Sequence, residues 1–396
     1  MRILHIIPSL APETGGTADG VQKICQALTK ERSEVVLFTS NWPNHSDLNS
    51  IGRSSIDGCL IETFLSKPSW VTANFPRSPY LVEAVKERSR DFDMVVIHSL
   101  WNPLVTFTMR ELRRIGTRYC IMPHGMLDPV ALKRNRWRKV PWAFLWEKNN
   151  IEGASLVIFN TEGEQIKARQ GGWRFKRTYV FPHIVDLSEW NKLPSRSMFE
   201  AKFPVVKGRE VILFVGRINW VKNLDKLLEA LVIVRQQRPL AMLVCVGPDS
   251  DGYRSKLGRR ARMLGVSDSL LFTGMMNRKD LTTAYARGGV FALVSQKENF
   301  GLAAAEALAS GLPVVLSEGV DVGRSLPSGG PVRIVRPVPE EIAEALVCML
   351  QRSDATGLPD LEALSLAEKA WGDPRSSVEE LINIFGEISE ERKSLN

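Results

Sequence analysis

The sequence has few of the features that crosslink a chain or anchor it in a membrane. Its five cysteines are odd in number, widely scattered and without a C-x-x-C pair, which argues against a disulfide framework and against zinc. Most of them lie inside apolar stretches, so we expect buried free thiols in a reducing compartment. No apolar run approaches the roughly 20 residues that a membrane-spanning helix needs. The run from Met1 to Pro8 is typical of a first strand rather than a signal peptide, and we expect a cytoplasmic protein.

The length and the apolar pattern predict an α/β protein with two Rossmann-like domains. At 396 residues the chain is long for one domain and comfortable for two. Short β-branched runs alternate with helix-period stretches, a pattern that favours parallel sheets covered by helices. We predict an N-terminal domain over 1–190, a second domain over 191–375 and a last helix over 376–396 that crosses back to the first domain. Ligands of such sheets lie at the carboxyl ends of the strands, here in the cleft between the domains.

The strongest chemical pattern surrounds a helix that is expected to begin near residue 301. Phe300, Gly301 and Leu302 stand at this helix start, where backbone N–H groups and the positive helix end can bind a diphosphate. Glu298 precedes the helix and Glu306 lies inside it, roughly 9 Å further along at about 1.5 Å per residue. The two carboxylates can therefore bind hydroxyl groups on either side of a diphosphate. Taken singly, they are equally well interpreted as a helix-capping acid and a solvated helix residue.

A second pattern lies at the end of an earlier strand. Gly216 turns the chain there and presents Arg217, and Lys222 follows at the opening of the next helix. Negative charge grows on a leaving diphosphate in the transition state, and two fixed cations are the expected partners. As isolated residues, both cations would be interpreted as solvated loop residues.

Together these segments resemble the signature of the group-1 family of retaining glycosyltransferases, which have the GT-B fold. The resemblance lies in the E-x7-E spacing from Glu298 to Glu306, in its F-G-L, E-A-L-A and G-L-P-V-V surroundings, and in the G-R…K pattern of Arg217 and Lys222. It implies that Arg217, Lys222 and the helix amides hold the donor diphosphate. It also implies that Glu298 contacts the donor sugar and Glu306 the ribose. The donor is then a nucleotide-diphosphate sugar, and no further cofactor is expected.

The resemblance assigns the acceptor side to the N-terminal domain. Gly15 and Gly16 resemble the family's glycine-rich loop, which lets the backbone approach a ligand closely, although ordinary turns also use such pairs. His124 follows a predicted strand, in a position where the family places a residue beside the transferred sugar. His98 ends another strand and is equally well interpreted as a structural histidine. The family's usual N-G-V-D before the linker is replaced by His183-Ile-Val-Asp186, so the local turn must differ.

Two D-x-D triplets raise the alternative of a metal-dependent enzyme. Asp91-Phe-Asp93 precedes a strand instead of ending one, and Asp249-Ser-Asp251 lies in a predicted loop without further acidic partners. Arg217, Lys222 and the helix end already supply the positive charge that a metal ion would bring. We therefore predict that the reaction needs no metal.

Positive charge gathers in residues 131–180, which contain eleven Lys or Arg and four acids. Within this window, Lys133–Trp146 interleaves basic residues with tryptophans, a composition that suits the headgroup layer of an anionic membrane. RNA binding uses the same ingredients, but no nucleic-acid motif accompanies them. The alternative is a basic face that packs its aromatic side chains into its own domain. Membrane binding would place the protein peripherally on the inner face of the plasma membrane.

The sequence thus predicts a retaining, metal-independent glycosyltransferase of the hexosyltransferase type. It would move a sugar from a nucleotide-diphosphate donor to a saccharide or to a lipid-linked acceptor of cell-envelope polysaccharide biosynthesis. Two alternatives stay open. A nucleotide-sugar epimerase on the same fold would release an altered nucleotide sugar without an acceptor, and a GT-B-like protein could bind such a ligand without catalysis. The motifs encode neither the nucleotide and sugar nor the acceptor.

Overall fold

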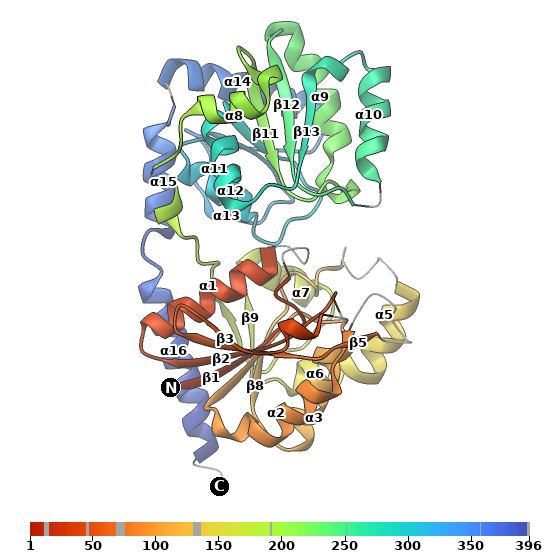
Figure 1. Cartoon of the computed structure of the whole chain (residues 1–396), viewed down its shortest axis with the longest axis vertical. Coiled ribbons are helices and arrows are strands. Elements are labelled where there is room, and N and C mark those ends of the chain that lie inside the picture. The colour runs from red at the N-terminus through yellow and green to blue at the C-terminus, as the bar shows by residue number, and fades with distance from the viewer. Residues whose placement is uncertain are drawn as a thin grey trace. The chain divides into compact units, whose positions relative to one another are not determined.

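The computed structural model describes residues 1–11, 16–44, 47–68, 76–129, 136–190, 192–250, 252–356 and 358–393 (Figure 1). The chain forms two compact units. Unit 1 comprises Met1–Ile184 and Asp373–Asn396, and unit 2 comprises Val185–Gly372. The division falls ahead of the predicted boundary at residue 190, because Val185 and Trp190 are buried in the core of unit 2.

Unit 1 is built on one large, mostly parallel sheet. In the described residues the sheet has eight strands in the order β10-β9-β8-β7-β1-β2-β4-β3, and β3 alone runs antiparallel, against β4. The strands are β1 (Arg2–Ile6), β2 (Glu34–Ser40), β3 (Gly52–Ile56), β4 (Cys59–Phe64), β7 (Met94–His98), β8 (Tyr119–Met122), β9 (Leu156–Phe159) and β10 (Thr178–Val180). A separate short pair joins β5 (Lys67–Pro68) to β6 (Pro76–Arg77).

Helices cover both faces of this sheet, because alternate residues of each buried strand point to opposite faces. Ile3 of β1 packs in the cluster that includes α1 (Gly16–Lys30) and α16 (Arg375–Lys393). Leu4 and Ile6 pack in the opposite cluster. That cluster is covered by α2 (Pro79–Arg88), α3 (Pro103–Arg114), α6 (Lys148–Gly153) and α7 (Glu162–Gln170). The segment before α6 forms α5 (Arg136–Trp142) and one π-helical turn, Ala143–Glu147.

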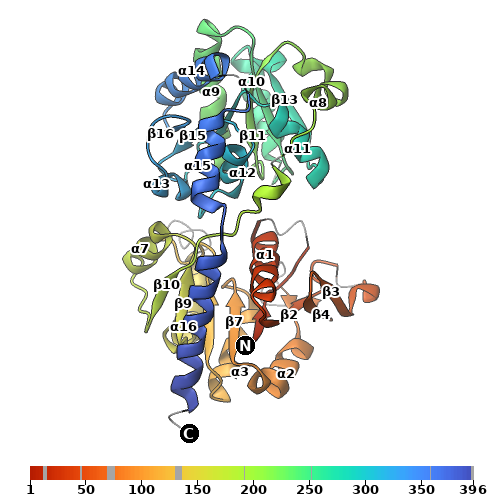
Figure 2. The same cartoon turned by 90° about the vertical axis from the view of Figure 1, so that its left-hand side faces the viewer.

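The last helix, α16, belongs to unit 1 although it follows unit 2 in the sequence. Its apolar face, with Leu381, Phe385 and Ile388, is buried with strand and α1 residues. At the edge of this contact Arg177 pairs with Glu387 at 2.6 Å. Figure 2 shows α16 and α1 on the side of unit 1 that faces the viewer.

Unit 2 has one parallel sheet, which in its described residues contains six strands in the order β13-β12-β11-β14-β15-β16. The strands are β11 (Glu210–Val215), β12 (Ala241–Val246), β13 (Leu270–Gly274), β14 (Val290–Leu293), β15 (Val314–Ser317) and β16 (Val332–Val335). The helices are α8 (Arg196–Lys202), α9 (Leu224–Gln237), α10 (Tyr253–Met263), α11 (Arg278–Arg287), α12 (Leu302–Ala309), α13 (Val322–Ser325), α14 (Pro339–Thr356) and α15 (Leu361–Trp371).

The strand order of unit 2 reverses between β11 and β14. From β11 the chain moves through α9 to β12 on one side, and it later returns through α11 to β14 on the other side. Because such crossovers are right-handed, α9 and α11 cover opposite faces of the sheet. The carboxyl ends of β11 and β14 therefore flank a topological switch point, where open α/β sheets bind their ligands.

Candidate active site

The carboxyl ends of β11 and β14 bring together residues from the two patterns found in the sequence. Lys222 forms an ion pair with Glu298, and the two side chains are 16% and 24% exposed. Two hydrogen bonds hold their loops together: the backbone N–H of Gln296 donates to the carbonyl of Val221 at 2.7 Å, and Asn223 Nδ2 donates to the carbonyl of Val294 at 2.9 Å. The sequence did not indicate that the predicted diphosphate cation and the predicted sugar carboxylate are direct partners.

The start of α12 has a backbone conformation that favours glycine. Gly301 is the N-cap and lies in the left-handed region with φ +91°, without a side-chain cap. A Cβ atom added to Gly301 would lie 2.9 Å from Val320 Cγ1, so a larger residue would be both strained and crowded. The neighbouring Phe300 is 5% exposed and packs edge-on to Trp371, so its contribution to a ligand site is limited to its backbone. Leu302 opens the helix.

Glu306 is more enclosed than the sequence suggested. The residue is 4% exposed, which excludes the interpretation as a solvated helix residue. Arg278 Nη1 donates to its Oε1 at 2.6 Å, and the hydroxyl of Tyr285 donates to its Oε2 at 2.9 Å. Trp190 lies under the Arg278 guanidinium, 4.7 Å from ring centre to Cζ, and packs edge-on to Tyr285. Arg278, Tyr285 and Trp190 were not found from the sequence, because nothing in their spacing connects α11, or the segment that contains Trp190, with α12.

Three histidines of unit 1, of which His5 and His98 are buried and His124 is partly exposed, form a connected group. His98, at the end of β7, lies between His5 of β1 and His124, which follows β8. His5 Nδ1 is 2.8 Å from His98 Nε2, and His98 Nδ1 is 3.0 Å from His124 Nε2. Burial lowers the pKa of His5 and of His124 to about 3, and it also lowers the pKa of His98. His98, for which the sequence left two interpretations open, thus directly supports the predicted sugar-contact residue.

Two buried carboxylates of unit 1 organise the loops around these histidines. Glu164 is 2% exposed; its Oε1 accepts from the backbone N–H of Gly125, and its Oε2 accepts from the N–H of Asn160 at 2.8 Å. Glu147 accepts from the N–H of Trp101 at 3.1 Å, and burial raises its pKa. Neither residue was found from the sequence, because an isolated Glu in a helical stretch is normally a surface residue.

The predicted glycine loop is only partly described. Gly15 lies outside the described residues. Gly16 is the first residue of α1, is exposed, and has no atom within 4 Å of an added Cβ. Gly20 is the glycine of α1 that packing requires, because an added Cβ would lie 2.7 Å from the ring of His183.

The D-x-D triplets have structural partners where they are described. Asp93 accepts from the backbone N–H of Arg2 at 2.8 Å, and Asp249 accepts from the N–H of Arg254 at 2.9 Å. Asp251 lies outside the described residues. Among those that are described, no three or more His, Cys, Asp or Glu side chains gather as metal ligands. Independence from metal stays a prediction.

The basic and aromatic window divides into two parts. Trp142 and Trp146 pack on each other and on Phe107, as the alternative interpretation expected. Trp137, Val140, Phe144 and Leu145 are 71%, 54%, 80% and 55% exposed. The window's first residues, Lys133 to Asn135, lie outside the described residues. In the described chain no helix is both long and apolar enough to cross a bilayer.

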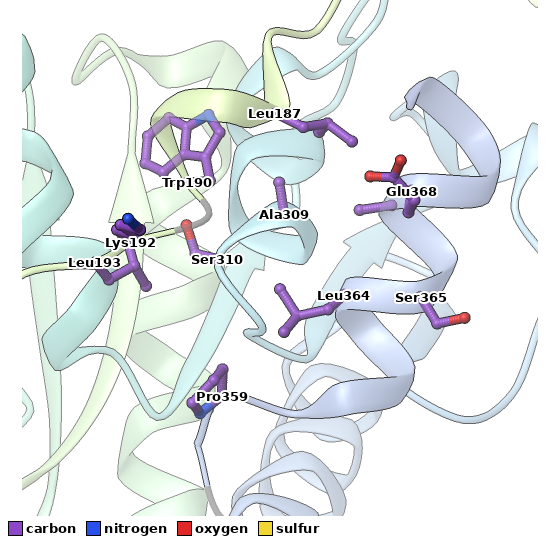
Figure 3. Close-up of a pocket in the computed structure, with 11 residues that line it drawn as sticks. Leu187, Trp190, Lys192, Leu193, Ala309, Ser310, Pro359, Leu364, Ser365 and Glu368 are labelled. Carbon is purple, nitrogen blue, oxygen red and sulfur yellow. The ribbon is translucent and has the colours of Figure 1, made fainter. Parts of the chain in front are cut away.

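A separate cavity of about 710 Å³ opens elsewhere in unit 2 (Figure 3). Its wall is formed by three segments: the start of the unit, with Leu187, Trp190 and Leu193; the end of α12; and α15. Its charged lining residues are Lys192 and Glu368. None of the residues predicted to bind the donor lines it, since α12 contributes its last residue, not its first. We do not assign this cavity to the donor.

Comparison with known families identifies the group to which this site belongs. The pattern described as "Glycosyl transferases group 1" matches residues 195–346, and that of "Glycosyltransferase Family 4" matches residues 14–189. The chain belongs to the group 1 glycosyl transferases. The two matches cover most of unit 2 and of unit 1 respectively, so the family resemblance seen in the sequence is confirmed.

Individual relatives agree with this family. The D-inositol 3-phosphate glycosyltransferase of Corynebacterium urealyticum is 26% identical over 339 residues, which are 80% of this chain and 79% of the relative. The Anabaena HepE structure in complex with UDP and glucose has a TM-score of 0.76 at 20% identity, covering 98% of this chain and 100% of that chain. A trehalose-6-phosphate synthase, studied for glycosyl transfer with retention, has a TM-score of 0.72 at 17% identity, covering 98% and 99%. These structural likenesses show the fold, and the predicted GT-B fold class is confirmed.

Proposed function

We propose that this glycosyltransferase moves a sugar from a nucleotide-diphosphate donor to a phosphate-bearing acceptor, with retention of the anomeric configuration and without a metal. The observation that carries the donor assignment is the junction of Lys222, Glu298 and the glycine-capped start of α12 at the β11/β14 switch point. Such a junction combines a cation, a carboxylate and backbone N–H groups, which match a diphosphate and the hydroxyl groups beside it.

Each residue has a distinct proposed role. Arg217, which is exposed, and Lys222 bind the diphosphate and stabilise the charge that it gains on leaving. Glu298 accepts a hydrogen bond from a hydroxyl of the sugar, which replaces part of its contact with Lys222. Glu306 accepts a hydrogen bond from a ribose hydroxyl. His124 of unit 1 is the proposed further contact to the transferred sugar. The HepE complex with UDP and glucose and the trehalose-6-phosphate synthase work on retention support a UDP-type donor and a retaining reaction.

The acceptor proposal rests on charge. Residues 131–180 hold eleven Lys or Arg against four acids, which suits an anionic partner. A sugar phosphate and a phosphate-linked lipid share this chemistry, and the inositol phosphate glycosyltransferase among the relatives supports it. The exposed side chains of Trp137, Phe144 and Leu145 favour the lipid-linked form, presented at the inner face of an anionic membrane of the cell envelope.

A donor screen tests the reaction. UDP-glucose and other nucleotide-diphosphate sugars are incubated with the purified chain and with myo-inositol phosphate or a polyprenyl phosphate sugar, and nucleotide diphosphate release is measured. We expect Lys222→Ala and Glu298→Gln to lower kcat/KM by about 100-fold or more, as for other groups that contact a developing charge. Glu229→Gln, which breaks an exposed pair with Arg260 in the same unit, should change it less than twofold.

The products distinguish the alternatives. The anomeric proton signal of the glycoside shows whether configuration is retained. An altered nucleotide sugar formed without acceptor would identify an epimerase instead. Binding of UDP without turnover of any donor would indicate a binding protein.

The membrane is tested separately with vesicles of phosphatidylcholine alone or mixed with phosphatidylglycerol, at low salt. We expect sedimentation with the anionic vesicles only, and its loss in the double variant Phe144→Ser, Leu145→Ser. Met263→Ser, at an exposed site in unit 2, is the control. Equal sedimentation of the double variant and of the control would refute the membrane surface while leaving the transferase proposal intact.

A further inference from the structure

Three imidazole rings of unit 1 are joined in a row by direct hydrogen bonds. The two contacts are His5 Nδ1 to His98 Nε2 at 2.8 Å and His98 Nδ1 to His124 Nε2 at 3.0 Å. The ring planes are nearly parallel, with interplanar angles of 18° and 21° and centroids 5.1 Å and 5.3 Å apart. Histidine side chains that meet in this way share protons, so the state of one ring depends on the next.

The row follows from the strand order. β1, β7 and β8 are neighbours in the sheet, and His5 and His98 fall on the face that carries Ile3 and Val96 toward α1 and α16. His124 continues the same alternation two residues beyond Met122. It has φ +50°, an unusual conformation for a residue with a side chain, held where Gly125 donates to the buried Glu164.

Proton counting limits the row to two arrangements. Burial keeps these rings neutral near pH 7, and a neutral imidazole has one N–H and one lone pair. Each of the two hydrogen bonds needs one N–H and one lone pair. Either all three rings carry hydrogen on Nδ1 and donate from His5 toward His124, or all three carry it on Nε2 and donate in the opposite direction.

The two ends of the row decide between these arrangements. His5 Nε2 and His124 Nδ1 are both buried without a hydrogen-bond partner. Both arrangements leave one N–H and one lone pair unpaired, and they differ in which ring carries the unpaired N–H. His5 is 1% exposed at the inner end of the row, whereas His124 is partly exposed, so an N–H without an acceptor costs less at His124 than at His5. The Nδ1–H arrangement therefore leaves His5 with the less costly unpaired atom. It also leaves His124 with an N–H that lacks an acceptor until a ligand supplies one.

We propose that His5 and His98 are positioning residues that hold His124 in the Nδ1–H form, so that it offers a hydrogen-bond donor to an oxygen atom of the bound sugar. This inference rests on the proposed function for the identity of the ligand, but the state of the rings is independent of it. The same row would make His124 a poor proton acceptor, because its lone pair is already occupied by His98.

Nitrogen NMR of the full chain labelled with 15N-histidine tests the ring states directly. Two-bond and three-bond couplings from the ring carbon-bound protons distinguish an Nδ1–H ring from an Nε2–H ring, and single substitutions assign the signals. We expect Nδ1–H rings for His5, His98 and His124 at pH 7. An Nε2–H ring at any of the three positions overturns the proposal, whether or not the chain turns over a sugar donor.

A matched pair of variants tests the effect on the reaction with UDP-glucose. His98→Asn keeps a nitrogen near the Nδ1 position that can donate to His124 Nε2, whereas His98→Leu removes this donor and frees the His124 ring to carry its hydrogen on Nε2. We expect His98→Leu to lower kcat/KM by about 10-fold, the effect of an unsatisfied polar contact, and to give Nε2–H character at His124. His98→Asn should stay within about threefold of the parent. Equal activity and an unchanged His124 signal in a folded His98→Leu chain contradict the proposal. Inactivity of the parent chain with every donor refutes the proposed function instead.

Discussion

Replacing Arg278 by leucine tests whether the proposed ribose contact is held by its neighbours inside unit 2. Arg278 Nη1 donates to Glu306 Oε1 at 2.6 Å, and the same guanidinium lies 4.7 Å from the centre of the Trp190 ring. The Glu306 side chain is 5% exposed, whereas that of Arg278 is 37% exposed. The variant removes a charged donor from a buried carboxylate and leaves the hydroxyl of Tyr285 in place.

The expected cost follows from this difference in exposure. Removing one partner of a fully buried pair costs about 3–5 kcal/mol. Water can reach the Arg278 side and replace part of the lost contact, so we expect the free energy of unfolding to fall by about 1.5–3 kcal/mol. A carboxylate that is no longer held should also bind ribose hydroxyls less well. We expect the Kd for UDP to rise about tenfold, which corresponds to roughly 1.4 kcal/mol.

Chemical denaturation and calorimetric titration with UDP measure the two effects. The control is Arg260→Leu, which breaks the pair with Glu229 between side chains that are 44% and 32% exposed. It should cost no more than about 0.5 kcal/mol and leave the Kd for UDP unchanged. In a double-mutant cycle with Glu306→Gln, we expect a coupling energy of about 1 kcal/mol or more. A cost equal to that of the control, together with additive effects in the cycle, would refute the reasoning.

Three further predictions concern the backbone and the buried charges. Gly301→Ala forces a residue with a side chain into φ +91° and places its Cβ atom 2.9 Å from Val320. Thermal melting should therefore show a loss of about 1–2 kcal/mol in the free energy of unfolding. The control, Gly16→Ala, adds a Cβ atom with no other atom within 4 Å and should leave this free energy unchanged. Glu164→Gln places an amide nitrogen, itself a donor, against one of two backbone N–H donors. The fold-decrease in kcat should exceed the fold-change in the Kd for UDP. Burial lowers the pKa of His5 to about 3, whereas the ring in the unfolded chain has a pKa of about 6.5. The unfolded chain therefore binds a proton at this ring first as the pH falls. Below about pH 6.5 the free energy of unfolding then decreases by about 1.4 kcal/mol per pH unit for this ring. Urea titrations at pH 7 and pH 5 should show a smaller decrease for His5→Leu than for the parent, and equal decreases would contradict this sign.

The donor side of the fold was largely accessible from the sequence. The strand that ends at Val215, before the Gly216 turn, and the helix that begins at Leu302 are marked by local signals, a glycine turn and an apolar run, and both lie where they were predicted. The proximity of Lys222 and Glu298 was not accessible, because it depends on β11 and β14 being neighbours in the sheet. Strand order is set by the packing of the whole unit and has no signal within either segment.

The same limitation explains the two residues that were interpreted least well. Glu306 is buried because Tyr285 and Arg278, on the preceding helix α11, donate hydrogen bonds to its carboxylate, and a helix of alanines gives no sign of these partners. His98 was balanced between a structural and a functional interpretation, and its two hydrogen bonds show why the alternatives could not be separated. It packs as a buried residue of β7 and at the same time fixes the proton of His124. A residue that acts only through its neighbour has the burial of a core residue, so its contribution can be detected only in the state of the ring that it supports.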